Sequence, residues 1–116
     1  MKFLSPAKLN LNLRVISKRN DGYHNLETTF QLINLFDEIS FKESDKSFGI
    51  SCDGLDIEPK NNLIFKSLNA ITKHCNVDKG IQIHLKKIIP AGAGLGGGSS
   101  NAATTLIALN KIWDLN

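Results

Sequence analysis

The residues best suited to chemistry lie in one glycine-rich stretch, Pro90 to Ala103, which reads Pro-Ala-Gly-Ala-Gly-Leu-Gly-Gly-Gly-Ser-Ser-Asn-Ala-Ala. Five of its fourteen residues are glycine, and glycine lets a backbone adopt positive φ and approach a ligand closely. A helix that begins at Ser99 or Ser100 would direct its free N–H groups and its positive dipole end into this loop. Such loops bind anions, most often phosphate. The stretch therefore predicts the phosphate-binding loop of a nucleotide-using protein.

Two common glycine motifs do not explain this loop. Gly92, Gly94 and Gly97 match the dinucleotide pattern G-x-G-x-x-G, but that pattern also requires a further strand and an acidic residue about 20 positions onward. The 116 residues end before such a second strand could form. A Walker A loop requires Lys-Ser or Lys-Thr after its last glycine, whereas Gly98 is followed by two serines. A purely structural glycine turn would not explain five glycines that lead into a serine-capped helix.

The first element expected to position functional groups is a strand over residues 7–18, where apolar and polar residues alternate. Its buried face would carry Leu9, Leu11, Leu13 and Val15, and its polar face Lys8, Asn10, Asn12 and Arg14. The polar face either lies in solvent or presents its side chains to a substrate. Periodicity alone favours solvent.

A turn is predicted at residues 19–22, Arg-Asn-Asp-Gly, because Asp-Gly suits positive φ. Tyr23 and His24 follow it directly and lead into a β-rich run over residues 27–35. The ring and the imidazole could stack on a base and hydrogen-bond to it. Alternatively, Tyr23 packs on the turn and His24 is exposed. Without other evidence, this simpler alternative is favoured.

The middle of the chain predicts a hairpin and a helix. Two short strands over residues 37–42 and 48–52 would be joined by a turn at residues 44–47. A helix would follow, capped by Asn61 or Asn62 and ending at Cys75. Its apolar face would consist of Leu63, Ile64, Leu68 and Ile71.

A strand over residues 81–86 leads to the glycine-rich loop, with Ile81, Ile83 and Leu85 on one face. Lys86 and Lys87 stand just before the loop and are either a solvated pair or nucleotide contacts. A final helix is expected over residues 100–113. Its core positions would be Leu106, Ile107, Leu109 and Trp113.

Composition limits the protein class. With 116 residues, 41% hydrophobic and 22% charged, the chain reads as one globular domain rather than a disordered or membrane-spanning protein. No apolar run is as long as a transmembrane helix, and the first six residues break too early for a signal peptide. Cys52 and Cys75 have no metal or redox spacing, so we expect reduced thiols and a cytoplasmic protein. The net charge of +3 suits an anionic ligand without requiring nucleic acid.

Three segments together resemble one kinase family. Residues 5–11, Ser-Pro-Ala-Lys-Leu-Asn-Leu, residues 19–26, Arg-Asn-Asp-Gly-Tyr-His-Asn-Leu, and the glycine-rich loop are similar to the GHMP kinases, which include galactokinase, homoserine kinase and mevalonate kinase. The loop alone would indicate only this superfamily. The other two segments resemble, within it, the 4-diphosphocytidyl-2-C-methyl-D-erythritol kinases of non-mevalonate isoprenoid biosynthesis.

The resemblance implies an α+β fold, in which a mixed sheet carries helices on one side. It implies transfer of the γ-phosphoryl group of ATP, with Mg²⁺, to the 2-hydroxyl of the methylerythritol moiety. In this scheme Lys8 is catalytic and steadies charge beside the hydroxyl, and Asn10 binds the methylerythritol end. Tyr23 and His24 hold the cytidine by stacking and base-edge hydrogen bonds.

The resemblance also implies an ATP site. Asn62, Leu63 and Lys87 correspond to positions around the adenine and ribose. The phosphates would be wrapped by the loop residues Pro90, Gly92, Gly94, Leu95, Gly96, Gly97, Gly98, Ser99 and Ser100. No metal ligand is identifiable, and Ser99 or Ser100 is the only candidate.

One expected part is missing. The family carries its catalytic base, an Asp in a Gly-Ala-Asp-Val-Pro segment, downstream of the final predicted helix, and no equivalent occurs up to Asn116. Asp37 and Asp114 lie in other contexts. A missing general base typically costs about 10²–10⁴-fold in rate. We therefore expect residues 1–116 to be a truncated N-terminal ATP- and substrate-binding domain, without the C-terminal domain, that binds nucleotide weakly and turns over little by itself.

Two other functions remain open. The family's N-terminal fold resembles RNA-binding domains of ribosomal and translation proteins, but here the lysines are dispersed and not clustered along one face. The chain could also be a non-catalytic remnant that pairs with a partner. Strand edges and helix faces left uncovered by truncation would favour self-association.

Overall fold

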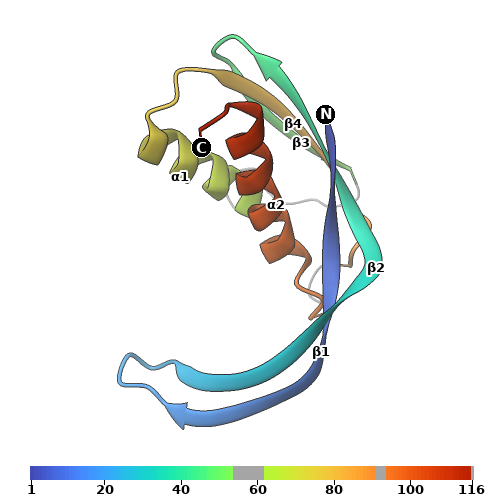
Figure 1. Cartoon of the computed structure of the whole chain (residues 1–116), viewed down its shortest axis with the longest axis vertical. Coiled ribbons are helices and arrows are strands. Elements are labelled where there is room, and N and C mark those ends of the chain that lie inside the picture. The colour runs from blue at the N-terminus through green and yellow to red at the C-terminus, as the bar shows by residue number, and fades with distance from the viewer. Residues whose placement is uncertain (54–61, 91–93, 116) are drawn as a thin grey trace.

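The computed structural model describes residues 1–53, 62–90 and 94–115, and in these ranges a bowed sheet carries two helices on one side (Figure 1). The elements follow the order β1 (Lys2–Lys18), β2 (His24–Ser44), β3 (Phe48–Asp53), α1 (Leu63–Cys75), β4 (Gly80–Lys86) and α2 (Gly97–Ile112). The α+β architecture with helices on one side is confirmed. Neither helix in the described ranges is long and apolar enough to cross a membrane.

The sheet is mixed, with strand order β1-β2-β4-β3. β1 and β2 pair antiparallel, as do β2 and β4, whereas β3 and β4 are parallel. The predicted hairpin of residues 37–42 with 48–52 is therefore wrong, because β4 lies between the two strands. The start of β4 binds the predicted turn itself: Gly80 N–H donates to the Asp45 carbonyl at 2.9 Å and Ile81 N–H to the Ser47 carbonyl at 3.0 Å. A Cβ at Gly80 would collide with the Ser47 backbone. A glycine at this position therefore allows the start of β4 to lie close to the turn.

The hydrophobic core fills the space between the sheet and the two helices. β2 and β4 contribute alternate residues, as the pattern of residues 81–86 predicts, and both helices contribute one face. Its buried members are Ile39, Phe41, Ile64, Leu68, Ile81, Ile83, Leu85, Ala108, Leu109 and Trp113.

Helix α1 agrees with its prediction, because Asn62 caps it by accepting a hydrogen bond from Ile64 N–H at 2.8 Å. Asn61 lies outside the described residues. Ile64 and Leu68 are buried and Ile71 is half-buried, but Leu63 is exposed in the first turn.

Helix α2 begins at Gly97, two or three residues before the predicted start, and its core face is partly different from the predicted one. Leu109 and Trp113 are buried as expected, whereas Leu106 and Ile107 are exposed. The buried helical positions include Asn101, Thr104, Thr105 and Ala108. The prediction placed Leu106 and Ile107 in the core because they are hydrophobic. In the structure, a partly polar stripe of the helix faces the core instead.

The far halves of β1 and β2 form a long antiparallel ribbon that extends beyond the helices (Figure 1). The predicted turn closes it, with Gly22 at φ +89°. Leu9, Leu11 and Val15 are exposed there, so the predicted buried face of residues 7–18 is wrong for these positions; the side chain of Leu13 lies outside the described part. The pattern is that of a half-buried strand, but none of the described helices covers this portion of the ribbon.

The revised core of α2 can be tested with a pair of leucine variants. Leu109→Ala is expected to lower the free energy of unfolding by about 2–5 kcal/mol, because the deleted side chain is fully buried. Leu106→Ala is the matched control three residues away and should change it by about 0.5 kcal/mol. Urea unfolding followed by circular dichroism measures both. Equal losses in the two variants would contradict this placement of α2.

Candidate active site

A buried ion pair lies beneath the glycine-rich loop. The Lys87 side chain is 6% exposed and that of Asp37 is 0% exposed, with Nζ and Oδ2 separated by 2.6 Å. The other carboxylate oxygen of Asp37 accepts hydrogen bonds from the backbone N–H groups of Ile88, at 2.6 Å, and Ile89, at 2.8 Å. Asp37 on β2 therefore fixes the segment that leads from β4 into the loop.

Asn101 connects this ion pair to α2 and β1. Its Nδ2 donates to Asp37 Oδ2 at 3.0 Å and to Ser5 Oγ at 2.9 Å, and its Oδ1 accepts from Lys87 Nζ at 3.3 Å. Ser5 Oγ in turn donates to Ser100 Oγ at 3.0 Å. These five residues, which we call the polar cluster, hold both ends of the loop on β1 and β2.

The protonation of Asp37 reflects opposing influences. Burial is the largest single one and raises the pKa of its carboxyl group, but the hydrogen bonds from Lys87, Ile89, Ile88 and Asn101 together outweigh it. The pKa is therefore lowered from its ordinary value of 3.8. Asp37 therefore stays ionised in the interior, with the Lys87 side chain hydrogen-bonded to it.

The loop ends at a helix N-terminus without a side-chain cap among the described residues. Gly96 is the N-cap of α2, with φ +68°, and the first helical hydrogen bond runs from Ser100 N–H to its carbonyl at 2.9 Å. Because this bond starts at Ser100, the N–H groups of Gly97, Gly98 and Ser99 have no intrahelical partner. They and the helix dipole favour an anion at this point.

Lys8 of β1 packs directly on this loop, although it lies 86 residues from Gly94. Its backbone N–H donates to the Leu95 carbonyl at 2.9 Å, and its Nζ donates to the Gly94 carbonyl at 3.0 Å. Asn10 Oδ1 accepts a further bond from Nζ at 3.1 Å. A Cβ at Gly96 would lie 2.9 Å from Lys8 Cε, so a glycine lets the lysine stem lie against the loop.

Other predicted ATP-site residues surround the same loop. A Cβ added at Gly98 would lie 3.2 Å from Leu63 Cδ1, so these two residues are neighbours. Asn62, the cap of α1, immediately precedes Leu63. Pro90 and Ser99 are exposed. Gly92 falls within residues 91–93, outside the described ranges. The nucleotide contacts of all these residues stay predictions.

Lys87 has a structural role that the sequence did not indicate. Its ammonium group is bonded to Asp37 and Asn101 and is nearly inaccessible. A Cβ at Gly97 would lie 2.7 Å from Lys87 Nζ, so the first turn of α2 closes over it. A direct contact between Lys87 and a nucleotide stays a prediction, but this ammonium group already has two partners.

Tyr23 and His24 lie at the tip of the ribbon, away from the glycine-rich loop (Figure 1). Tyr23 is 73% exposed, and its backbone N–H donates to Asp21 Oδ1 at 3.1 Å. No hydrogen bond within the described ranges joins these two residues to the loop. Lys8 and the loop thus converge, whereas the two predicted cytidine ligands form a separate exposed group.

Sequence reasoning missed three members of the polar cluster: Ser5, Asp37 and Asn101. A signal for Asp37 was present, because it alternates in register with Ile39 and Phe41 on the buried face of β2. A charged residue at such a position is unusual unless it is paired. Within the described residues no group of three His, Cys, Asp or Glu side chains could hold a metal ion.

The Asp37–Lys87 pair gives a pH-dependent prediction. Asp37→Asn is expected to lower the free energy of unfolding at pH 7 by about 3–5 kcal/mol, because Lys87 would be left buried without its counter-charge. Since the folded-state pKa of Asp37 is lowered, its contribution is complete above 3.8 and is lost as the pH falls through the lower value. The difference between the two proteins should therefore shrink in strong acid, as urea unfolding at several pH values would measure.

The control is Glu38→Gln, which removes the neighbouring carboxylate from a solvent-exposed pair with Lys2 at 3.9 Å. This change should cost about 0–1 kcal/mol. A loss in Asp37→Asn that is as small as this, or that does not change with pH, would contradict the role assigned to the pair.

In sequence, the chain is similar to known kinases. Residues 62–116 match the family of GHMP kinases N terminal domains. A 4-diphosphocytidyl-2-C-methyl-D-erythritol kinase from Syntrophus aciditrophicus is 47% identical over 117 residues, covering 100% of this chain and 42% of that protein. One of the same name from Prochlorococcus marinus (strain MIT 9215) is 52% identical over 114 residues, covering 97% of this chain and 37% of that protein.

A solved structure supports the same relationship. The crystal structure of a 4-(cytidine 5'-diphospho)-2C-methyl-D-erythritol kinase superposes with a TM-score of 0.88 at 35% identity, covering 100% of this chain and 42% of that one. The chain thus spans roughly two fifths of the length of the curated relatives it matches. By sequence and by fold it resembles the N-terminal part of the GHMP kinases.

Proposed function

We propose that residues 1–116 form the N-terminal ATP- and substrate-binding domain of a kinase that phosphorylates the 2-hydroxyl of 4-diphosphocytidyl-2-C-methyl-D-erythritol. One observation carries the proposal: Lys8 Nζ lies 3.0 Å from the Gly94 carbonyl, at the loop that ends in the N-terminus of α2. The names of relatives about half identical to this chain support the choice of substrate.

The loop is suited to the phosphates of ATP. The N–H groups of Gly97, Gly98 and Ser99 and the dipole of α2 supply positive potential without a mobile side chain. Phosphoryl transfer depends mainly on positioning the reactants and neutralising the charge of the transferred group. A rigid backbone site contributes to both, because it needs little reorganisation when charge develops.

Lys8 is the proposed catalytic residue. A lysine ammonium group has three N–H donors, and two of those of Lys8 are directed to the Gly94 carbonyl and to Asn10 Oδ1. Within the described residues the third donor has no partner, and we propose that it binds a substrate hydroxyl or a phosphate oxygen. Asn10 accepts from Lys8 through Oδ1, which leaves its Nδ2 group to hydrogen-bond the methylerythritol end of the substrate.

The remaining assignments follow from the family resemblance. ATP supplies the transferred phosphoryl group, together with Mg²⁺, and Asn62, Leu63 and Lys87 border its adenine and ribose. Tyr23 and His24 hold the cytidine at the ribbon tip. A cytoplasmic location is part of the proposal, as is self-association through the exposed apolar side chains of the ribbon.

The ATP site can be tested by residue-resolved binding. Adding ATP to the ¹⁵N-labelled chain should shift the amide signals of residues 94–100 and of Lys8. Lys8→Met should weaken ATP binding about tenfold, because a charge-assisted hydrogen bond contributes roughly 1.5–3 kcal/mol. With the substrate present, the same variant should also lower the slow formation of ADP.

Lys2→Met is the matched control, since Lys2 is an exposed lysine of the same strand. It should bind ATP like the unmodified chain. Shifts that cluster away from the loop, or equal weakening in both lysine variants, would argue against the ATP site.

The cytidine site can be tested separately with cytidine diphosphate. This nucleotide should shift the signals of Tyr23 and His24, and Tyr23→Ala should weaken its binding about tenfold while ATP binding is unchanged, because base stacking contributes roughly 1–3 kcal/mol. Phe30→Ala, which removes another exposed aromatic ring from the ribbon, is the control and should have no effect. Tight cytidine diphosphate binding by Tyr23→Ala would exclude stacking on this ring.

A further inference from the structure

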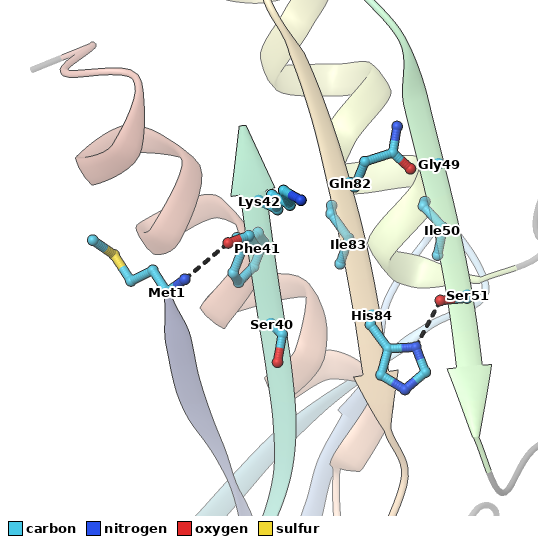
Figure 2. Close-up of a pocket in the computed structure, with 10 residues that line it drawn as sticks. All are labelled: Met1, Ser40, Phe41, Lys42, Gly49, Ile50, Ser51, Gln82, Ile83 and His84. Atoms are coloured by element: carbon cyan, nitrogen blue, oxygen red, sulfur yellow. Dashed lines mark hydrogen bonds between the residues drawn. The ribbon is translucent and has the colours of Figure 1, made fainter. Parts of the chain in front are cut away.

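A second group of reactive side chains lies on the sheet face opposite the helices (Figure 2). Ser51 Oγ is 2.6 Å from His84 Nδ1, and His84 Nε2 is 3.0 Å from Asp53 Oδ2. Ser51 and Asp53 are two residues apart on β3 and so share a face, and His84 lies opposite Ser51 on β4. The strands therefore hold a serine, a histidine and a carboxylate in a continuous chain of hydrogen bonds.

The two hydrogen bonds fix the tautomer of the imidazole. An ionised carboxylate only accepts hydrogen bonds, so His84 Nε2 must carry the proton that it donates to Asp53. In a neutral imidazole the other nitrogen is then an acceptor, and Nδ1 accepts from the Ser51 hydroxyl. This is the division of roles in a Ser-His-Asp nucleophile system, with the two ring nitrogens exchanged.

Reactants can reach this group. Ser51 and His84 line a groove of about 560 Å³ together with Ser40, Lys42 and Gln82. The side chain of His84 is 43% exposed and that of Asp53 is 72% exposed. Figure 2 shows the Ser51–His84 hydrogen bond on this open face, with the helices behind the sheet.

We propose that Ser51, activated by His84 and Asp53, is a nucleophile toward small activated carboxylic esters. It is separate from the glycine-rich loop and shares none of the residues assigned to phosphoryl transfer. Lys42 in the same groove favours esters whose acyl group carries a carboxylate, because its ammonium charge attracts an anion.

The reaction is a two-step acyl transfer. Ser51 Oγ forms a bond to the acyl carbon while the bond from that carbon to the leaving oxygen breaks. The hydroxyl proton moves to His84 Nδ1 and then to the leaving alkoxide or phenoxide, while Asp53 stabilises the imidazolium through Nε2. Water then attacks the acyl-Ser51 ester, passes its proton along the same route, and releases a carboxylic acid and the free serine.

The chain offers an internal control for the serine. Ser40 of β2 lies opposite His84 on its other side, just as Ser51 of β3 does. Ser40 lines the same groove, but the hydrogen bond of the imidazole goes to Ser51. Ser51→Ala and Ser40→Ala therefore remove the same group at two positions that differ in this bond.

The probe is p-nitrophenyl acetate, added to the whole chain, with release of p-nitrophenolate and acetylation of Ser51 read by absorbance and by peptide mass spectrometry. Ser51→Ala should lose the acetylated peptide and release p-nitrophenolate about 10²-fold more slowly, the lower end of the range for general-base assistance. His84→Gln should be as slow. Asp53→Asn should retain the acetylation site but react about tenfold more slowly, and Ser40→Ala should be unchanged.

Circular dichroism of each variant verifies the fold, and exposed positions such as Asp53 tolerate substitution. The mono-p-nitrophenyl ester of adipic acid, whose carboxylate is too far from its own ester group to displace the phenolate quickly, should react faster than the acetate, and Lys42→Gln should remove that preference. Equal rates in folded Ser51→Ala and Ser40→Ala would overturn the proposal. Acetylation found only on lysines or on the amino terminus would overturn it as well.

Discussion

The buried Asp37–Lys87 ion pair is the constraint on which the rest of the site depends. Two charges removed from water are costly unless all their hydrogen-bonding groups are satisfied. Here the backbone N–H groups of Ile88 and Ile89 and the amide of Asn101 complete the shell of the carboxylate. The pair is therefore favourable only when β2, the end of β4 and the first turns of α2 are all in place. Breaking it would release both ends of the glycine-rich loop.

Two glycines of the loop, Gly96 and Gly97, are explained by the lysines that they contact. Gly96 lies against the stem of Lys8, and Gly97 lies against the ammonium group of Lys87. A side chain at either position would move a lysine away from its partner. Gly96 also has positive φ, which disfavours other residues. The loop conformation is thus determined as much by Lys8, which is distant in sequence, and by the buried Lys87 as by the composition of the loop itself.

Local signals predicted the elements that depend on local interactions. The Asn62 cap, the alternation of β4 and the glycines before α2 each lie within a few residues of the feature they specify. The predicted hairpin around residues 44–47 was wrong because β4, some 35 residues later in the chain, lies between β2 and β3, where Gly80 hydrogen-bonds to the turn. The predictions of a buried face on the ribbon and of an apolar core face on α2 were wrong for the same reason. The burial of a residue depends on which distant element packs against it. In the candidate site, family motifs pointed to Lys8 and the loop, which the fold brings together, but only the fold revealed that Asp37 and Asn101 hold the loop.

Burial assigns different roles to the two lysines beside the loop. Lys87 is enclosed, and its charge is neutralised by Asp37, so it contributes to the shape of the loop and little to its potential. Lys8 lies at the surface of the site, and within the described residues its ammonium group is bonded to two neutral oxygens, those of Gly94 and Asn10. Its charge is therefore available to an anion. Two unpaired lysines at the site would repel each other, whereas one neutralised lysine holds the loop in place and the other leaves a positive charge for the phosphate that we propose binds here. The sequence shows two equivalent residues, and their opposite functions follow from whether a carboxylate lies within hydrogen-bonding distance.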